Sequence, residues 1–202
     1  MTETVEARMR RTREQPPQGF FWVDLEMSGL DADRHVILEA ACVVTDPFGK
    51  ELSSFAAVIH HGSLDESDFE PYSWQQHSGS GLIDACLSDG LSLGQVDEAM
   101  ARTAEEFFPG VSAYLAGNSV YRDWTFIRRH MPRLFSMLHY RLLDVTSLKL
   151  IAQSSGIAPY PKAKNHRALD DIRESIGEMQ HILREFSRGP QFGASSFTDR
   201  DK

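Results

Sequence analysis

Residues 20–27 read FFWVDLEM, an apolar run with two carboxylates near its end, and this stretch decides the fold. Aromatic and β-branched residues favour a strand, in which residues two apart project from the same face. Asp24 and Glu26 are therefore expected to lie side by side. Two carboxylates so close repel one another unless a cation joins them. The stretch predicts a strand with a metal ion bound near its end.

The sequence beyond this strand alternates between strand and helix patterns. Two more strands are predicted directly after it, over 36–45 and 52–59. Helical spacing then alternates with short apolar runs, giving helices over 95–108, 123–130, 145–153 and 167–186 and strands over 111–117 and 141–143. This order predicts an α/β fold with a mixed five-stranded sheet flanked by helices.

Both ends of the chain have a different composition from the centre. Residues 1–19 are polar and charged and contain Pro16-Pro17, and residues 188–202 are rich in glycine, serine and charge. Both segments are predicted to be disordered extensions. Residues 20–187 are then expected to form one domain, which is large enough to bury its own core.

Composition limits the setting and the partners. Cys42 and Cys86 are the only cysteines, and no signal peptide or transmembrane run is found, so we expect a cytoplasmic protein without a membrane partner. A net charge of −8 argues against coating long nucleic acid. Residues 121–170 nevertheless carry nine Lys and Arg against three Asp and Glu. A small basic funnel beside acidic ligands suits a short anionic substrate.

Two later segments offer further carboxylates for a metal site. Asp123 follows a predicted strand, and Asp170 and Asp171 lie in the final helix. At about 100° per residue, Asp170 falls opposite the apolar stripe of that helix, whereas Asp171 falls on its flank. Asp171 is the better candidate ligand. An oxygen-only set of this kind suits Mg²⁺ or Mn²⁺ rather than zinc.

Four ordered blocks carry a family resemblance. They are FWVDLEMSGLDADRHVILEAACVVTD (21–46), GNSVYRDWTF (117–126), MPRLFSMLHYRLLDVTSLK (131–149) and NHRALDDIRESIGE (165–178). Together they resemble the oligoribonucleases of the DEDDh exonuclease family. The resemblance implies an RNase H-like fold and a 3′–5′ exoribonuclease that hydrolyses very short RNA, dinucleotides above all, with two divalent cations, Mg²⁺ or Mn²⁺.

The resemblance also implies roles for particular residues. Asp24, Glu26, Asp123 and Asp171 would hold the cations, and the pattern H-x-x-x-x-D pairs His166 with Asp171, making His166 the general base. Lys162, Lys164 and Arg167 add positive charge beside it.

On the substrate side, the resemblance implies three groups of contacts. Leu30 would wedge between two terminal bases, Trp74 would line the base pocket, and His77 would lie on the substrate side. Ser119, Arg141 and Thr146 would cap a 5′ phosphate. Tyr140 would stack on the substrate of the opposite subunit, which implies a homodimer.

Three alternatives stay open. One is a phosphodiesterase or phosphatase of the same fold that acts on a modified nucleotide in a small-molecule pathway. This hypothesis is favoured by Ser28, which stands where the family usually has Thr, and by the short spacing between Trp74 and His77. The others are a DNA exonuclease of the proofreading type and a binding module that has lost catalysis.

Overall fold

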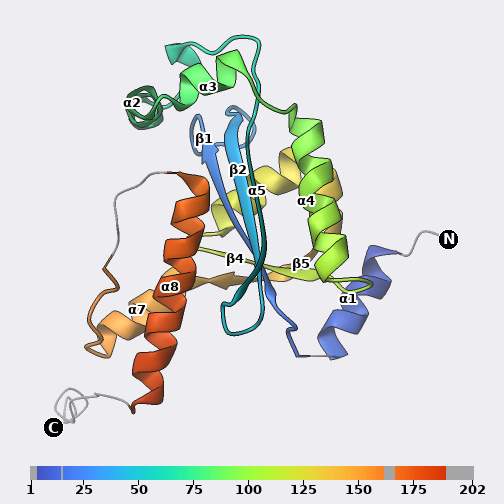
Figure 1. Ribbon diagram of the computed structural model, residues 1–202, viewed down its shortest axis with the longest axis vertical. Helices are drawn as coiled ribbons and strands as arrows, with labels where there is room; N and C mark the ends of the chain where they lie inside the picture. Colours follow the sequence, from blue (N-terminus) through green and yellow to red (C-terminus); the bar gives the residue numbers. More distant parts are fainter. Residues whose placement is uncertain (1–3, 15, 162–166, 190–202) are drawn as a thin grey trace, which may run out of the picture.

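A mixed sheet of five strands forms the centre of the protein, whose computed structural model describes residues 4–14, 16–161 and 167–189 (Figure 1). The strands are β1 (Phe20–Met27), β2 (Ile37–Thr45), β3 (Glu51–Val58), β4 (Ala113–Gly117) and β5 (Leu138–Asp144). Their order is β3-β2-β1-β4-β5, antiparallel within β1 to β3 and parallel from β1 through β4 to β5. The predicted α/β class with a mixed five-stranded sheet is confirmed.

Helices cover both faces of this sheet. They are α1 (Val5–Glu14), α2 (Pro71–Ser80), α3 (Leu82–Ser88), α4 (Leu93–Phe107), α5 (Tyr121–His130), α6 (Pro132–Met137), α7 (Val145–Ser154) and α8 (Ala168–Ser187), with a short 3₁₀ turn at Glu66–Asp68. In Figure 1, α8 and α4 lie on opposite sides of the sheet. Among the described residues, no helix is both long and apolar enough to cross a bilayer.

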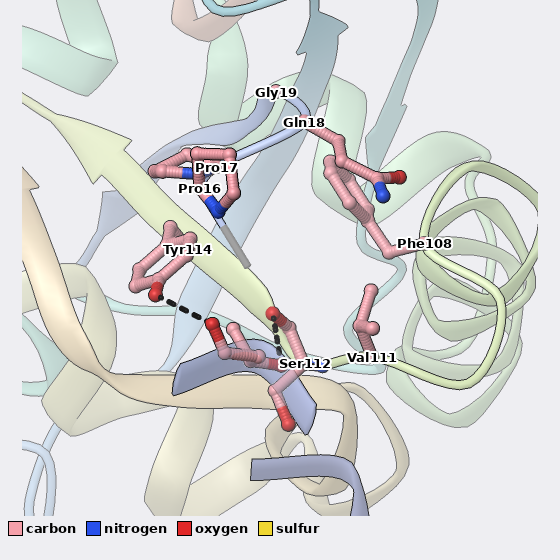
Figure 2. Close-up of a pocket in the computed structure, with 9 residues that line it drawn as sticks. Pro16, Pro17, Gln18, Gly19, Phe108, Val111, Ser112 and Tyr114 are labelled. Carbon is pink, nitrogen blue, oxygen red and sulfur yellow. Dashed lines mark hydrogen bonds between the residues drawn. The ribbon is translucent and has the colours of Figure 1, made fainter. Parts of the chain in front are cut away.

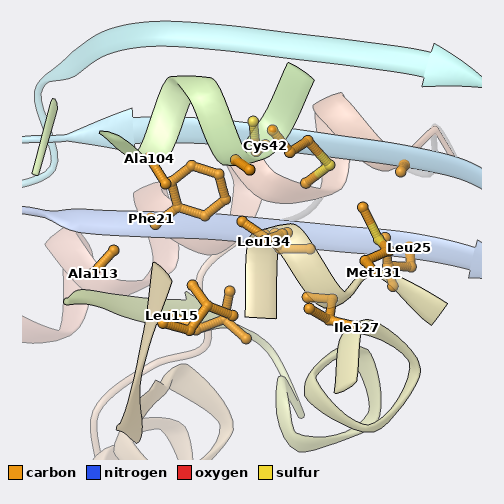
Figure 3. Packing of buried hydrophobic residues seen from close by; sticks show 14 of the residues in the cluster. Phe21, Leu25, Cys42, Ala104, Ala113, Leu115, Ile127, Met131 and Leu134 are labelled. Atoms are coloured by element: carbon orange, nitrogen blue, oxygen red, sulfur yellow. The ribbon is translucent and has the colours of Figure 1, made fainter. Parts of the chain in front are cut away.

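Strand β1 is buried on both faces, and its alternation sorts its residues between two cores. Phe21, Val23 and Leu25 enter the core formed with α4, α5 and α6 (Figure 3). Trp22 points the other way and joins a second core in which Ile172, Ile176 and Met179 of α8 take part. Asp24 and Glu26 continue the face of Trp22, because side chains alternate along a strand. The sequence of β1 thus directs both carboxylates towards α8.

The N-terminal segment is ordered where disorder was expected. Residues 5–14 form α1, which has little apolar surface of its own. The guanidinium of Arg8 is buried and donates to the carbonyls of Phe108 and Val111, at 3.2 and 3.1 Å. Oγ1 of Thr12 accepts from the Ser112 amide at 2.7 Å. The expectation was wrong for this helix because polar contacts to the end of α4, rather than an apolar stripe, attach it. Residues 190–202 of the expected tail lie outside the described residues.

The chain that links α1 to β1 lies over the same region. Pro16, Pro17 and Gly19 line a small cavity of about 20 Å³ together with Phe108 and Tyr114 (Figure 2). The Tyr114 hydroxyl donates to the carbonyl of Thr12 at 3.5 Å. Residues 16–19 therefore pack against the same region as α1.

Arg8→Ala is expected to lower the free energy of unfolding by about 2 kcal/mol, because it removes donors to buried carbonyls. Urea denaturation measures the loss, and amide exchange of residues 5–14 should become faster. Arg102→Ala is the matched control, since the Arg102 side chain on α4 is 75% exposed and pairs with Glu98 within its own helix. Equal stability of the two variants would contradict this account of α1.

Candidate active site

Three carboxylates from distant parts of the chain meet at one edge of the sheet. Oxygen atoms of Asp24, Glu26 and Asp171 all lie within 4.8 Å of one another. Asp24 and Glu26 come from the C-terminal end of β1, and Asp171 comes from the first turn of α8. The helix packs on β1 and β2 through Ile172 and Ile176, which places Asp171 over the end of the strand. The structure thus joins the beginning and the end of the domain at this site.

Asp123 lies beside this group. It is buried in the first turn of α5, and its Oδ1 accepts a hydrogen bond from the Leu25 amide at 2.9 Å. Leu25 lies between Asp24 and Glu26 in β1, so this bond fixes Asp123 against the strand that carries both. Among the described residues, the 4.8 Å group contains the other three carboxylates, and Asp123 adjoins it as a fourth.

Burial raises the pKa values of three of the four carboxylates, and neighbouring charges add to the shift for Asp24 and Glu26. Burial, followed by the charges of Asp171 and Glu39, raises the pKa of Glu26 to about 8. Burial raises the pKa of Asp123 to about 7, although the hydrogen bond from Leu25 opposes the shift. Burial and then the charge of Asp123 raise the pKa of Asp24 well above its usual range. Without a cation, the cluster therefore retains protons at neutral pH.

This donor set fits the divalent cations that the sequence predicted. Every donor is a carboxylate oxygen, which Mg²⁺ and Mn²⁺ prefer, and the set contains no sulfur. The raised pKa values give an independent reason, because a divalent cation would replace the protons and relieve the repulsion. The residues present at this edge therefore fit a divalent cation.

A fifth carboxylate, which the sequence analysis missed, lies behind the site. Glu39 is buried on β2 and is the cross-strand partner of Glu26. The guanidinium of Arg167 pairs with Glu39, with Nη2 to Oε1 at 2.7 Å and Nε within 3.3 Å of both oxygens. Arg167 is the residue before α8, so the ion pair connects the start of this helix to the sheet. A lone Glu inside the apolar run ILEAACVV was the available signal.

Arg167→Gln is expected to destabilise the protein by about 1–3 kcal/mol, because it leaves Glu39 buried without its cation. It should also weaken Mn²⁺ binding, since the start of the helix that carries Asp171 loses its attachment. Thermal unfolding and Mn²⁺ titration calorimetry measure the two effects. Arg173→Gln is the control, because Arg173, on the exposed side of α8, makes a similar pair with Glu51 of β3. Equal effects of the two variants would contradict the role given to Arg167.

The expected base-contacting residues differ in their exposure. Leu30 is 54% exposed, and its amide donates to Oε1 of Glu70 at 3.2 Å, so an apolar side chain is held out on a tethered loop. Trp74 is half-buried and packs edge-on against Phe69, at 5.2 Å between ring centres. The structure thus gives Trp74 a core contact as well as an accessible side.

His77 is buried rather than open to the solvent. Its Nε2 lies 3.1 Å from the carbonyl oxygen of Met27 and 3.8 Å from Oε2 of Glu26. Burial lowers the pKa of this imidazole, so the ring is neutral near pH 7. His77 supports the end of β1 in the structure, and this contact was not expected from the sequence.

Of the three residues expected at a 5′ phosphate, Ser119 and Thr146 are in contact with each other. The Ser119 amide donates to Oγ1 of Thr146 at 2.9 Å and to Oδ1 of Asp144 at 3.0 Å. Ser119 has a left-handed backbone, with φ of 50°, an uncommon conformation for a residue with a side chain. Arg141 does not take part in these bonds but lies over the ring of the exposed Tyr140, 5.5 Å from its centre. His166 lies outside the described residues.

Comparisons with known proteins show which family the chain resembles. The chain matches the Exonuclease family, RNase_T, over residues 21–179. It is 38% identical over 178 residues to the oligoribonuclease of Pseudomonas aeruginosa, covering 85% of this chain and 98% of that protein. A probable oligoribonuclease of Schizosaccharomyces pombe is 36% identical over 168 residues, covering 81% of this chain and 67% of that protein.

Solved structures share the fold. An exonuclease I from Methylocaldum szegediense has a TM-score of 0.65 at 16% identity, covering 86% of this chain and 42% of that one. A zinc-bound exonuclease I from E. coli in complex with single-stranded DNA has a TM-score of 0.67 at 12% identity, with the same coverage. The chain spans less than half of these larger proteins, and at such identities the likeness concerns the fold alone.

The fold and the acidic edge define an α/β nuclease of the RNase H-like type. The chain belongs to the Exonuclease family and, within it, to the oligoribonucleases. The resemblance read from the four sequence blocks is thereby confirmed. So is the predicted class of enzyme, a hydrolytic 3′–5′ exoribonuclease.

Proposed function

We propose that this exoribonuclease hydrolyses 5′-phosphorylated dinucleotides of RNA to mononucleotides, with two divalent cations, Mg²⁺ or Mn²⁺. Asp24, Glu26, Asp123 and Asp171 would hold the cations. The observation that carries the proposal is the meeting of three carboxylates within 4.8 Å, next to the buried Asp123. The names of the relatives point to oligoribonucleotides as the substrate class.

The bound cations would stabilise the negative charge that develops on the attacking and leaving oxygens of a phosphodiester. The chain's own residues have other tasks in the proposed reaction. His166 accepts the proton of the attacking water as general base, a task that suits an imidazole with a pKa of about 6.5. The buried Leu25 amide keeps Asp123 in place, so the site is preorganised before substrate arrives.

The other end of the dinucleotide is recognised by its phosphate. Ser119, Thr146 and Arg141 supply two hydroxyls and a guanidinium, the donors that a phosphate monoester accepts. Ser119 and Thr146 follow β4 and β5, which run parallel to β1, so this pocket lies at the same edge of the sheet as the carboxylates. A pocket that closes on the 5′ end leaves a longer strand no exit.

The bases lie between these two ends. The exposed Leu30 wedges between them, and Trp74 lines one side, with His77 behind the end of β1. Tyr140, whose ring is about half exposed, stacks on the substrate of a second subunit, so the active enzyme is a homodimer. We place this activity in the cytoplasm, where both free cysteines, Cys42 and Cys86, would remain reduced.

A length series tests the proposal. Turnover in Mn²⁺ is measured for 5′-phosphorylated RNA oligomers of increasing length, for the same oligomers without the 5′ phosphate, and for single-stranded DNA. We expect a steep preference for the phosphorylated dinucleotide that Arg141→Ala removes. Equal turnover of all lengths would reject the proposed recognition of the 5′ phosphate. Failure to cut any dinucleotide, with turnover of a nucleotide derivative, would favour the phosphodiesterase alternative instead.

A further inference from the structure

A line of partly buried hydrogen bonds connects α8 with the turn after β4, and Asn118 is its centre. Nδ2 of Asn118 donates to Oγ of Ser175 at 2.7 Å and to Oε2 of Glu178 at 3.2 Å, both on α8. On its other side, Oδ1 of Asn118 accepts from Oγ1 of Thr146 at 3.3 Å. One amide thus joins the C-terminal helix to the start of α7.

The two ends of this line lie in the two halves of the active site. Oγ of Ser175 donates to the main-chain carbonyl of Asp171 at 2.9 Å, and Asp171 is one of the clustered carboxylates. At the other end, Oγ1 of Thr146 accepts from the Ser119 amide at 2.9 Å. Side-chain hydrogen bonds thus link both Asp171 on α8 and Thr146 on α7 to the turn after β4.

Burial and charge make the line stiff. Ser175 and Glu178 are only 6% and 4% exposed, so their bonds exchange poorly with water. Nζ of Lys149 lies 3.3 Å from Oε2 of Glu178 and offsets its charge. The orientation of Asn118 is also fixed, because only the amide nitrogen can donate to a carboxylate and only the amide oxygen can accept from the threonine. An alanine or a leucine would remove all three of these hydrogen bonds.

From this geometry we infer that Asn118 and Ser175 are positioning residues that fix the span between the cleavage site at Asp171 and the 5′-phosphate pocket at Ser119 and Thr146. They thereby select the length of the RNA that is cut fastest. The inference rests on the proposed function, since it requires the 5′ phosphate to be held by that pocket. Neither residue contacts the substrate in this account.

Ser175→Ala tests the inference, with Ser155→Ala as its matched control. Ser155 is also buried, directly after the last residue of α7, and its Oγ donates to the carbonyl four residues earlier at 2.9 Å, as that of Ser175 does. Ser155 does not belong to the line. For each variant, kcat/KM is measured with 5′-phosphorylated RNA of two and of four nucleotides, together with thermal stability and Mn²⁺ affinity by calorimetry.

We expect Ser175→Ala to reduce the ratio of kcat/KM for the dinucleotide to kcat/KM for the tetranucleotide by about five-fold or more, as one lost hydrogen bond allows. Mn²⁺ affinity should stay within about two-fold, and Ser155→Ala should keep the wild-type ratio. Asn118→Ala, which cuts the line at its centre, should reduce the ratio further even where it costs stability.

The outcomes separate the inference from the proposed function. A wild-type enzyme without a length preference would overturn both. The inference alone would be overturned if the wild type has a steep length preference and Ser175→Ala and Asn118→Ala keep it, as Ser155→Ala is expected to. A ratio that falls only in proportion to the lost stability of all three variants would likewise assign the line a purely structural role.

Discussion

Asp24→Asn is expected to lower kcat/KM by about three orders of magnitude or more, the scale of losing one strong electrostatic partner of a transition state. The substitution keeps the shape of the side chain and removes its charge. Asp24 is the member of the cluster whose pKa is raised by all three other carboxylates of the site. Removing its charge therefore weakens the attraction for divalent cations, while the fold without metal should become more stable.

The measurement compares turnover of a dinucleotide with thermal unfolding in the presence of a chelator. Asp170→Asn is the matched control, because Asp170 adjoins Asp171 but is exposed on α8. It should retain wild-type activity within about two-fold. An Asp24→Asn enzyme with near-normal turnover, or one whose metal-free form melts at a lower temperature than wild type, would contradict the role given to this carboxylate.

Chelated wild-type protein is expected to lose stability as the pH rises from 6.5 to 8.5. The pKa of Glu26 is about 8 in the folded protein and that of Asp123 about 7, both above their values in an unfolded chain. A carboxyl group with a raised pKa stabilises the fold below its unfolded pKa, and this contribution is lost as the pH rises through the folded pKa. Saturating Mn²⁺ should remove most of this loss.

The pH window matters because His77 acts in the opposite direction. Its pKa is lowered by burial, so its neutral form favours the fold above pH 6.5 and its protonation opposes the fold below that value. Above pH 6.5 the carboxylates act without this opposition. Differential scanning calorimetry at pH 6.5, 7.5 and 8.5, with chelator and with Mn²⁺, measures the effect. Glu26→Gln should flatten the pH dependence, and a melting temperature of the chelated wild type that rises over this range would contradict the account.

Where the sequence has a strong strand or helix periodicity, that periodicity predicted both the element and the direction of its side chains. The alternation of FFWVDLEM gave both the strand and the shared face of Asp24 and Glu26. The helical period of α8 chose Asp171 over Asp170, and the structure places Asp171 in the cluster with Asp170 exposed. These predictions succeeded because a strand or helix carries its own periodicity, so the direction of each side chain follows from its position in the sequence.

Long-range polar contacts could not be predicted in the same way. The attachment of α1 depends on Arg8 reaching carbonyls at residues 108 and 111, and no local pattern encodes that approach. The pairing of Glu39 with Arg167 joins positions that are 128 residues apart, although a buried charge in β2 did require a partner. The family resemblance suggested a role for His77 on the substrate side, but the burial of its ring against Met27 followed only from the fold.

Anomalous diffraction from crystals of the full chain soaked in Mn²⁺ tests the central claim most directly, namely that carboxylates from β1, α5 and α8 together bind divalent cations. We expect two anomalous peaks within coordinating distance of Asp24, Glu26, Asp123 and Asp171, about 3.5–4 Å apart. No such peak should appear in Asp24→Asn crystals treated alike. Mn²⁺ bound elsewhere, with these four carboxylates left without a cation in a crystal that retains the fold, would contradict the claim.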